Sequence, residues 1–145
     1  MIAIDTNLLV YAHRGDMPQF EQAYAHIANL AESGRAWGIP VACVHEFLSV
    51  VTNHKIFADK KSSCAEALDQ IQSWLESPTA HLLHTGARHL EVLADLVQRA
   101  QVSGGEIHDA RIAAICIENG VTEFWSCDRD FGKFPQLKTR NPLVS

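Results

Sequence analysis

Residues 1–13 have the sequence MIAIDTNLLVYAH, in which a short apolar segment passes directly into a helical one. The first four residues predict a short β-strand that ends at Asp5. Residues 7–13 can form a short helix with Thr6 or Asn7 as its N-cap, since both side chains can accept a hydrogen bond from a free backbone N–H. A strand followed at once by a helix is typical of the βα units that build parallel sheets.

The rest of the chain continues this alternation. Apolar residues that recur at helical spacing, with Gly or Pro after the last of them, mark the helices, and short apolar runs mark the strands. Helices are predicted over 19–33, around 44–51, over 62–77 with Ser62 or Ser63 as the cap, around 90–97 and over 106–119; strands are predicted within 37–42, over 81–83, over 121–127 and within the tail 137–144. The pattern indicates an α/β fold, a mainly parallel sheet with helices on its faces, in one domain over 1–145.

Length and composition fit one globular domain. The 145 residues are 47% apolar and 20% charged, a balance that supports a core without a disulfide or zinc staple. No apolar run approaches the ~20 residues of a membrane helix, and Asp5 comes too early for a signal peptide. We therefore expect a soluble, cytoplasmic protein with no membrane association.

The cysteines and histidines form no recognised disulfide or zinc pattern. Cys43, Cys64, Cys116 and Cys127 include no C-x-x-C pair, and reduced thiols are expected in a cytosolic domain. The eight histidines lack the H-E-x-x-H context of a zinc site. A redox enzyme finds no support either, because no G-x-G-x-x-G sequence follows a strand.

The net charge of −5 comes from 17 acidic and 12 basic residues. A nucleic-acid-binding domain is usually basic, so the net charge alone argues against one. That inference weakens if several of the acids hold cations. The positions of the acids therefore matter more than their number.

Acidic residues occur at positions where a parallel sheet binds ligands, beyond the carboxyl ends of its strands. Asp5 follows the first strand, and Asp128 and Asp130 follow the strand over 121–127. Asp109 lies in the first turn of the helix before that strand. Glu46 interrupts an otherwise apolar helical run, where its side chain lies at the edge of the buried face or points into a cleft.

Each acid also has an ordinary structural interpretation. Asp5 could cap the next helix, and Asp109 could interact with the helix dipole. Asp128 and Asp130 could form a turn, and Glu46 could be solvated. Several acids at one sheet edge repel one another, however, unless a divalent cation neutralises them. We therefore expect at least one of them to have a raised pKa without metal.

Carboxylate oxygens suit Mg²⁺ or Mn²⁺, which can activate water for attack on a phosphodiester. If the five acids hold such a cation, 17 − 5 = 12 acids remain against 12 bases, so the rest of the surface is balanced. The charge argument against a nucleic-acid substrate then disappears.

At this point the sequence resembles the PIN domain family and, within it, the VapC-like toxins of type II toxin–antitoxin pairs. The matching pieces are Ile2-Ala3-Ile4-Asp5-Thr6-Asn7, Glu46 in the mid-chain helix, Ile107-His108-Asp109-Ala110-Arg111-Ile112-Ala113-Ala114 and Trp125-Ser126-Cys127-Asp128-Arg129-Asp130-Phe131. The resemblance spans Met1 to about Leu137. The four pieces occur in order and at suitable separations.

The resemblance implies a three-layer α/β/α sandwich and a metal-dependent ribonuclease that leaves 5′-phosphate and 3′-hydroxyl ends. It implies that Asp5, Glu46, Asp109 and Asp128 are catalytic, that Asp5, Asp109, Asp128 and Asp130 bind Mg²⁺ or Mn²⁺, and that the hydroxyls of Thr6 and Ser126 support the site. The implied partners are an RNA substrate, a second copy of the chain and a small cognate antitoxin that occupies the cleft.

Other side chains could contact the RNA. Arg111, Arg129, Lys133, Lys138 and Arg140 could bind phosphates, although Lys138 and Arg140 fit ordinary surface charge and Arg129 could pair with a site acid. The tryptophans Trp37, Trp74 and Trp125 could stack on bases, although Trp74 better fits a core or dimer position. His45 and His108 neighbour site acids but point about 100° away from them on their helices, so neither is assigned as a base.

Two other functions stay open. A PIN-like scaffold without catalysis could bind RNA or protein. A phosphatase could use Asp5 as a nucleophile, since an aspartate at the end of a strand suits phosphoryl transfer. Such phosphatases usually carry a second Asp two positions later, where this chain has Asn7.

Overall fold

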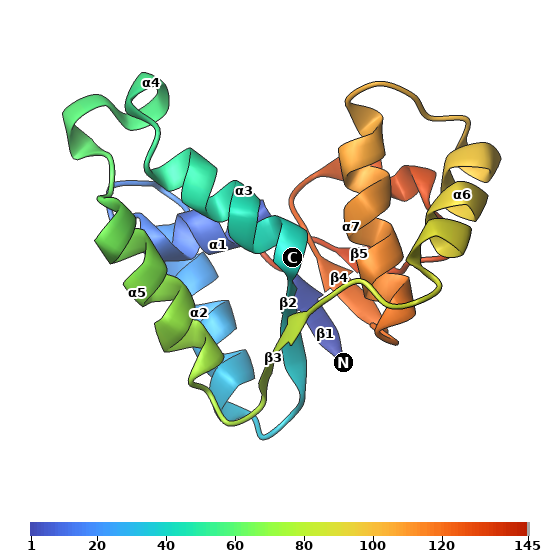
Figure 1. The fold of residues 1–145 in the computed structure, drawn as a ribbon. Helices are drawn as coiled ribbons and strands as arrows, with labels where there is room; N and C mark the ends of the chain where they lie inside the picture. Colours follow the sequence, from blue (N-terminus) through green and yellow to red (C-terminus); the bar gives the residue numbers. More distant parts are fainter. Residues whose placement is uncertain (145) are drawn as a thin grey trace.

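A five-stranded, all-parallel sheet forms the centre of the molecule (Figure 1). The computed structural model describes residues 1–144. The strands are β1 (Ile2–Ile4), β2 (Trp37–Pro40), β3 (Ala80–Leu83), β4 (Glu123–Trp125) and β5 (Thr139–Arg140), in the spatial order β3-β2-β1-β4-β5. The order reverses direction between β1 and β4. The topological switch point, where parallel sheets bind ligands, therefore lies at the carboxyl ends of these two strands.

Helices cover both faces of the sheet and give three layers. The helices are α1 (Thr6–His13), α2 (Phe20–Glu32), α3 (Val41–Val51), α4 (His54–Phe57), α5 (Cys64–Leu75), α6 (His89–Ala100) and α7 (Glu106–Glu118). Figure 1 shows α1, α2 and α5 on one side of the sheet and α6 and α7 on the other. Right-handed crossovers require this division, because the chain moves from β1 toward β3 and then returns to β4. Helix α3 contacts α1, α5 and α7.

The predicted three-layer α/β fold is confirmed, with several local corrections. Neither Thr6 nor Asn7 caps α1: the N-cap is Asp5, whose carboxylate accepts a hydrogen bond from the Thr6 N–H. Of the two candidates for α5, Ser63 is the cap and forms a capping box with Glu66. The short strand predicted within 37–42, at Ile39-Pro40-Val41, is β2 over Trp37–Pro40, because helix α3 already begins at Val41.

Three short helices escape the sequence pattern. Helix α4 and the 3₁₀ helix η1 (Ala58–Lys60) follow α3, and the 3₁₀ helix η2 (Arg129–Lys133) follows β4. Each has at most five residues, too few to repeat an apolar position with helical period. Among residues 1–144, none of the helices is both long and apolar enough to cross a membrane.

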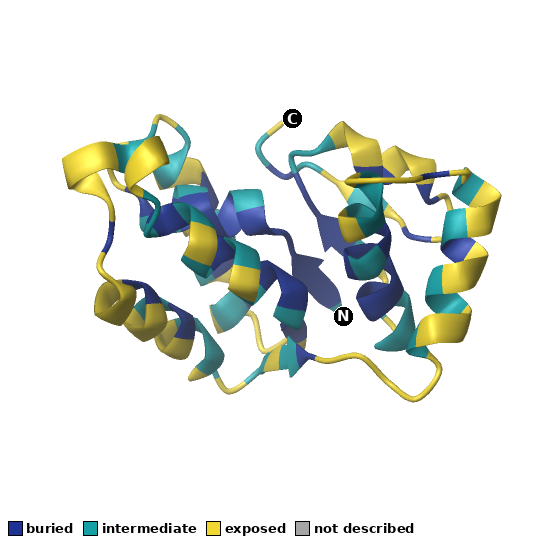
Figure 2. Ribbon diagram, turned by 45° about the horizontal axis from the view of Figure 1, so that its top comes forward, coloured by how far each residue is buried: buried dark blue, intermediate teal, exposed yellow. Residues whose placement is uncertain are grey.

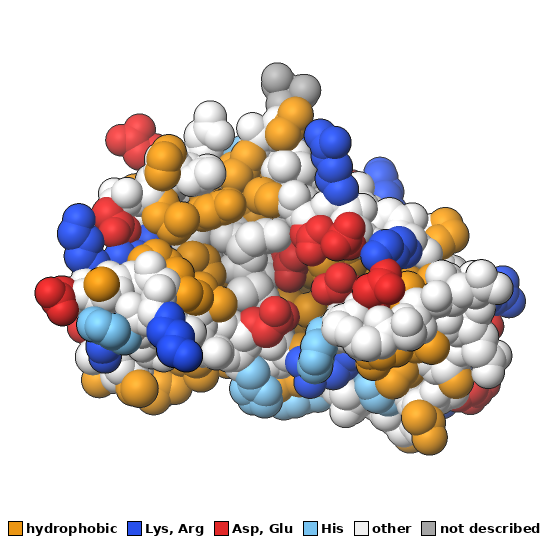
Figure 3. Space-filling model, turned by 90° about the horizontal axis from the view of Figure 1, so that it is seen from above, with side chains coloured by type: hydrophobic (Ala, Val, Ile, Leu, Met, Phe, Trp, Pro, Cys, Tyr) orange, Lys and Arg blue, Asp and Glu red, His pale blue; other side chains and the backbone are white. Residues whose placement is uncertain are grey.

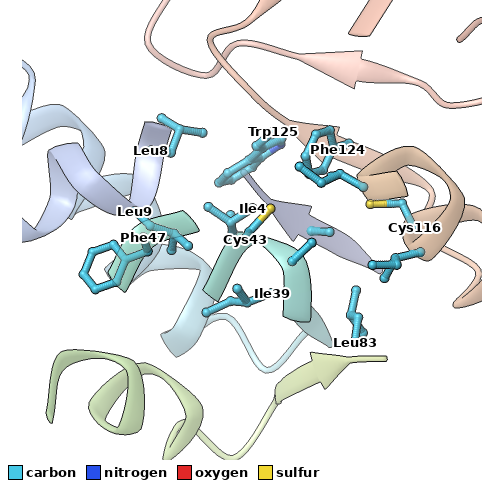
Figure 4. Close-up of a cluster of buried hydrophobic side chains, with 14 of the residues drawn as sticks. Ile4, Leu8, Leu9, Ile39, Cys43, Phe47, Leu83, Cys116, Phe124 and Trp125 are labelled. Carbon is cyan, nitrogen blue, oxygen red and sulfur yellow. The ribbon is translucent and has the colours of Figure 1, made fainter. Parts of the chain in front are cut away.

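The hydrophobic core fills both sides of the sheet (Figures 2 and 4). All residues of β1 and β2 are buried, as the strands at the centre of a parallel sheet require. Trp37 and Trp125 are buried as well, so the predicted stacking of these two rings on bases is wrong. Trp74 is half-buried and packs edge-on against Phe47 with ring centroids 5.4 Å apart, a contact that fits the core alternative of its prediction.

Gly38 allows β2 and β3 to pack side by side. A Cβ atom at this position would lie 2.8 Å from the side chain of Leu83, which is itself buried with an exposed fraction of 2%. A buried leucine can give way only by displacing its neighbours in the core. A side chain at position 38 therefore forces the two strands or the surrounding core apart.

We predict that Gly38→Ala lowers the free energy of unfolding by about 1–3 kcal/mol, the usual result of adding volume to a packed core. The measurement is equilibrium unfolding in urea. Gly15→Ala is the control, because a Cβ at Gly15 has no atom within 4 Å. Equal stability of the two variants would contradict the packing argument.

Candidate active site

Asp5 lies at the centre of the candidate site, buried at the carboxyl end of β1 with an exposed fraction of 5%. Its backbone N–H donates to the carbonyl oxygen of Trp125 at 2.9 Å, which fixes it beside β4. Its Oδ1 accepts the Thr6 N–H at 2.7 Å, and its Oδ2 accepts the Ser126 hydroxyl at 2.6 Å. The Cys43 thiol lies 3.5 Å from Oδ1. The carboxylate is therefore held from three different elements of the fold.

Asn7 also belongs to the site, although the sequence analysis did not select it. Its Nδ2 donates to Asp5 Oδ2 at 3.4 Å, and its Oδ1 accepts the Cys127 N–H at 3.3 Å. Ser126 Oγ in turn accepts the Asp128 N–H at 2.9 Å. These bonds tie the first turn of α1 to the loop after β4. The position of Asn7 two residues after Asp5 is the one sequence signal that could have revealed it.

Glu46 reaches the site from α3. It is half-buried, and its Oε1 accepts a hydrogen bond from the Thr6 hydroxyl at 3.3 Å. The Glu46 side chain therefore points into a cleft. This is one of the two alternatives that the sequence left open, the other being the edge of the buried helix face. Thr6 connects Glu46 to Asp5, because Thr6 and Asp5 are adjacent and the Thr6 N–H binds the Asp5 carboxylate.

A second group of acids comes from α7 and from the segment after β4. Carboxylate oxygens of Asp109, Asp128 and Asp130 lie within 4.8 Å of one another. Asp109 comes from the first turn of α7, and Asp128 is the N-cap of η2, where it accepts the Asp130 N–H at 2.8 Å. These three carboxylates form a group of oxygen ligands from two elements.

The two groups of acids surround one hollow of about 310 Å³, which we call the acidic hollow. Its walls include Asp5, Glu46, Asp109 and Asp128, with Thr6 and Asn7 between them and apolar side chains such as Tyr11 and Phe131 beside them. Figure 3 shows the acidic side chains gathered around this depression in the middle of the face. The structure thus brings the four predicted catalytic acids together. Of the predicted metal ligands, Asp130 joins Asp109 and Asp128, whereas Asp5 lines the same hollow outside that group.

Burial and repulsion change the protonation of two of these acids. The pKa of Asp5 rises from its usual 3.8 to about 6, chiefly because burial disfavours the charge; Glu46 adds repulsion, and the bonds from Ser126 and Thr6 oppose the rise. The pKa of Asp109 is also raised, first by burial and then by repulsion from Asp128 and Asp130. The expected rise is confirmed, although burial contributes more to it than repulsion.

Both oxygens of Asp5 accept hydrogen bonds and the side chain is almost inaccessible. One of these bonds comes from Asn7, which occupies the position where phosphatases of this kind carry a second Asp. The phosphatase alternative therefore lacks its second carboxylate.

Basic residues near the acids have different environments. Lys133 pairs with Glu106 at the start of α7, and this contact raises the pKa of Lys133. Lys138 and Arg140 pair with Glu123 at 3.3 and 3.8 Å. Arg129 is exposed and forms no ion pair with residues 1–144, so its predicted pairing with a site acid is wrong.

A family model described as the PIN domain matches residues 2–137. The chain belongs to the PIN-domain family. Ribonuclease VapC43 of Mycobacterium tuberculosis is 34% identical to it over 143 residues, which cover 99% of this chain and 96% of the relative. The resemblance to PIN domains and to VapC-like proteins is thereby confirmed.

Two solved structures share the PIN fold at low sequence identity. FitAcB from Neisseria gonorrhoeae superposes with a TM-score of 0.72 at 21% identity, over 100% of both chains. VapBC2 from Rickettsia felis was solved bound to a DNA fragment from the promoter of its own genes. It superposes with a TM-score of 0.70 at 18% identity, over 97% of this chain and 98% of that one. At these identities the comparison establishes the common architecture.

The raised pKa of Asp5 predicts a pH-dependent stability in metal-free buffer. The folded state holds the proton more tightly than the unfolded state, so the stabilisation is complete below about pH 4 and is lost as the pH rises through about 6. Relative to Asp5→Asn, the wild-type protein should lose up to about 3 kcal/mol of unfolding free energy from pH 4 to 7, since two pKa units correspond to about that value.

The measurement is urea unfolding with EDTA at several pH values. Asp16→Asn serves as a control of opposite sign, because Arg14 lowers the pKa of Asp16. Relative to that variant, the wild-type protein should gain stability as the pH rises toward 3.8, the usual pKa of Asp, and should change little from pH 4 to 7. A difference between wild type and Asp5→Asn that stays constant over this pH range would contradict the burial argument.

Proposed function

We propose that this protein is a metal-dependent ribonuclease that hydrolyses RNA phosphodiester bonds and acts as the toxin of a toxin–antitoxin pair. The observation that carries the proposal is the acidic hollow, in which Asp5, Glu46, Asp109 and Asp128 meet at the switch point of a PIN-domain sheet. The similarity to a protein named ribonuclease VapC43, over nearly the full length of both chains, supports the same activity.

The donor set fits a hard divalent cation. The candidate ligands are carboxylates, and Mg²⁺ and Mn²⁺ prefer oxygen ligands. In our proposal Asp109, Asp128 and Asp130 hold the cation together with Asp5. When bound, Mg²⁺ or Mn²⁺ supplies positive charge that polarises the phosphodiester and lowers the pKa of a water molecule.

The side chains around the cluster have separate roles in the proposal. Ser126 and Asn7 position the Asp5 carboxylate through the hydrogen bonds described above. Glu46 Oε1 is occupied by Thr6, whereas its Oε2 accepts no hydrogen bond from residues 1–144 and can take a proton. Water attacks phosphorus and gives its proton to Glu46 Oε2. The bond from phosphorus to the 3′ oxygen breaks, and that oxygen takes a proton from solvent, which leaves 5′-phosphate and 3′-hydroxyl ends.

The proposal includes partners and a location that follow from VapC-like relatives. We propose that a second copy of the chain forms a dimer, that a small cognate antitoxin occupies the acidic hollow, and that the pair acts in the cytoplasm. The support is the membership in the PIN-domain family and the similarity in fold to VapBC2.

We predict that purified, antitoxin-free protein cleaves mixed RNA that includes tRNA and rRNA fragments, with Mg²⁺ or Mn²⁺ and not with EDTA. Asp5→Asn and Asp109→Asn should each lower the cleavage rate by about 100-fold or more, the usual scale for loss of a catalytic group. Asp95→Asn is the matched control, because Asp95 is an exposed aspartate on α6 that pairs with Arg99.

Cleavage that continues in EDTA and in both site variants would overturn the metal-dependent mechanism. RNA binding without cleavage, unchanged by Asp5→Asn, would instead support the alternative of a non-catalytic PIN-like domain. Mapping the ends of the products tests the bond that breaks, since 3′-phosphate ends would contradict the proposed chemistry.

We further predict that saturating Mg²⁺ or Mn²⁺ raises the melting temperature by about 5 °C or more. A ligand at 100 times its dissociation constant stabilises the folded state by about 2.7 kcal/mol, and each kcal/mol corresponds to roughly 2–4 °C in a protein of this size. Asp109→Asn should reduce this rise, because it removes a ligand, whereas Asp95→Asn should preserve it. A melting temperature that stays the same with and without Mg²⁺ or Mn²⁺ would contradict the proposed metal site.

A further inference from the structure

A second hollow lies directly beside the acidic hollow and differs from it in charge. It has a volume of about 240 Å³ and lies between the loop after β4 and the end of β5. Asp128 lines both hollows, so the two share a wall. The other charged side chains of the second hollow are Arg129 and Arg140. We call it the arginine hollow.

The two guanidinium groups retain capacity to bind an anion. Arg129 is exposed and has no ion pair within residues 1–144. Arg140 lies 3.8 Å from Glu123, at the limit of an ion pair, and its side chain is 56% exposed. Lys138 approaches the same Glu123 more closely, at 3.3 Å. Guanidinium groups match the oxygens of a phosphate with two parallel hydrogen bonds each.

Asn141 adds an uncharged donor to the same hollow. Its Oδ1 accepts the Leu143 N–H at 3.0 Å and the Cys127 thiol at 3.5 Å, which fixes the orientation of the amide. The Nδ2 atom donates to no acceptor within residues 1–144. Asn141 lines the hollow, and its Nδ2 can donate a hydrogen bond to a ligand there. This donor again matches an anion.

Ser126 joins the two hollows rigidly. Its backbone N–H donates to the carbonyl oxygen of Arg140 at 2.9 Å, and its hydroxyl donates to Asp5 at 2.6 Å. The arginine hollow therefore keeps a fixed position relative to the acids. Figure 3 shows basic side chains beside the acidic group on the same face.

We propose that the arginine hollow binds the backbone phosphate next to the scissile phosphodiester of an RNA strand. This inference rests on the proposed function, since it assigns the scissile group to the acidic hollow. Adjacent phosphates of one strand then occupy adjacent hollows: the first lies at the acidic hollow, whose carboxylates would hold a cation, and Arg129, Arg140 and Asn141 bind the second. Contacts of this kind position the strand and do not read its bases.

The test compares two pairs of substitutions that change the net charge equally. Both are made in Asp109→Asn, so that the RNA is not cut. One pair is Arg129→Gln with Arg140→Gln. The other is Arg88→Gln with Arg99→Gln. Both arginines are exposed; Arg88 is the N-cap of α6 and Arg99 lies in its last turn, and α6 packs beside α7. The probe is a short fluorescein-labelled single-stranded RNA of mixed sequence with Mg²⁺, and fluorescence anisotropy gives its dissociation constant over a range of KCl concentrations.

We expect the Arg129/Arg140 pair to weaken RNA binding by about tenfold or more, the scale of a lost charge-assisted contact. The plot of log affinity against log salt should become shallower by about 0.7, since the two arginines bind one phosphate and each neutralised phosphate of a single strand contributes about 0.7. The Arg88/Arg99 pair should leave both quantities near those of the parent. Equal effects of the two pairs would overturn the subsite, because the loss would then reflect only the net charge.

Two further outcomes separate this inference from the proposed function. If the protein with Asp109 intact cleaves RNA but the Arg129/Arg140 pair binds like its parent, the subsite is wrong and the nuclease function stands. An unchanged affinity for RNA together with loss of antitoxin binding would show that the arginine hollow is a protein contact, and this also overturns the proposal. Arginine-dependent binding without any metal-dependent cleavage would support the subsite and contradict the nuclease function.

Discussion

The hydrogen bond between the Ser126 hydroxyl and the Asp5 carboxylate is the interaction on which the rest of the site depends. It crosses from the end of β4 to the end of β1, the two strands between which the sheet order reverses. A carboxylate buried this deeply needs polar partners, because an unpaired buried charge is strongly unfavourable. Ser126, Thr6 and Asn7 supply them, and the same bonds fix the loop that carries Asp128. The hydrogen bonds that satisfy the buried Asp5 therefore also position Asp128.

This arrangement places stability and function in opposition. Burial raises the pKa of Asp5, and burial with repulsion raises that of Asp109, so the ionised site opposes folding at neutral pH when no cation is present. The rest of the fold must offset this unfavourable contribution. The completely buried strands β1 and β2, and the close packing of Gly38 on Leu83, supply the rigid support on which an unfavourable cluster of charges can persist. In our proposal a divalent cation at the cluster offsets the repulsion and makes the same geometry favourable.

The sequence predicts those parts of the site that follow from the periodicity of strands and helices. Asp5 and Asp128 are found because the carboxyl ends of parallel strands share one edge, and Glu46 is found because it interrupts an apolar helical face. Asn7 escapes prediction because its partner, the Cys127 N–H, lies 120 positions away in the chain. The ion-pair state of Arg129 likewise depends on the path of η2, a helix too short to leave a periodic signal.

Net charge is a poor guide to nucleic-acid binding in this protein because charge is segregated at short range. The total of −5 argues against an anionic substrate, yet the acids that produce much of it face one hollow, and two arginines face the adjoining one. A strand of RNA experiences the local field at each phosphate, since salt screens charges beyond about 8–10 Å. In our proposal a divalent cation offsets part of the negative charge of the acidic hollow and presents a positive ion to one phosphate, while the arginine hollow attracts the next. In our proposal the fixed separation of the two hollows, set by Ser126, then determines which phosphodiester of a bound strand meets the carboxylates.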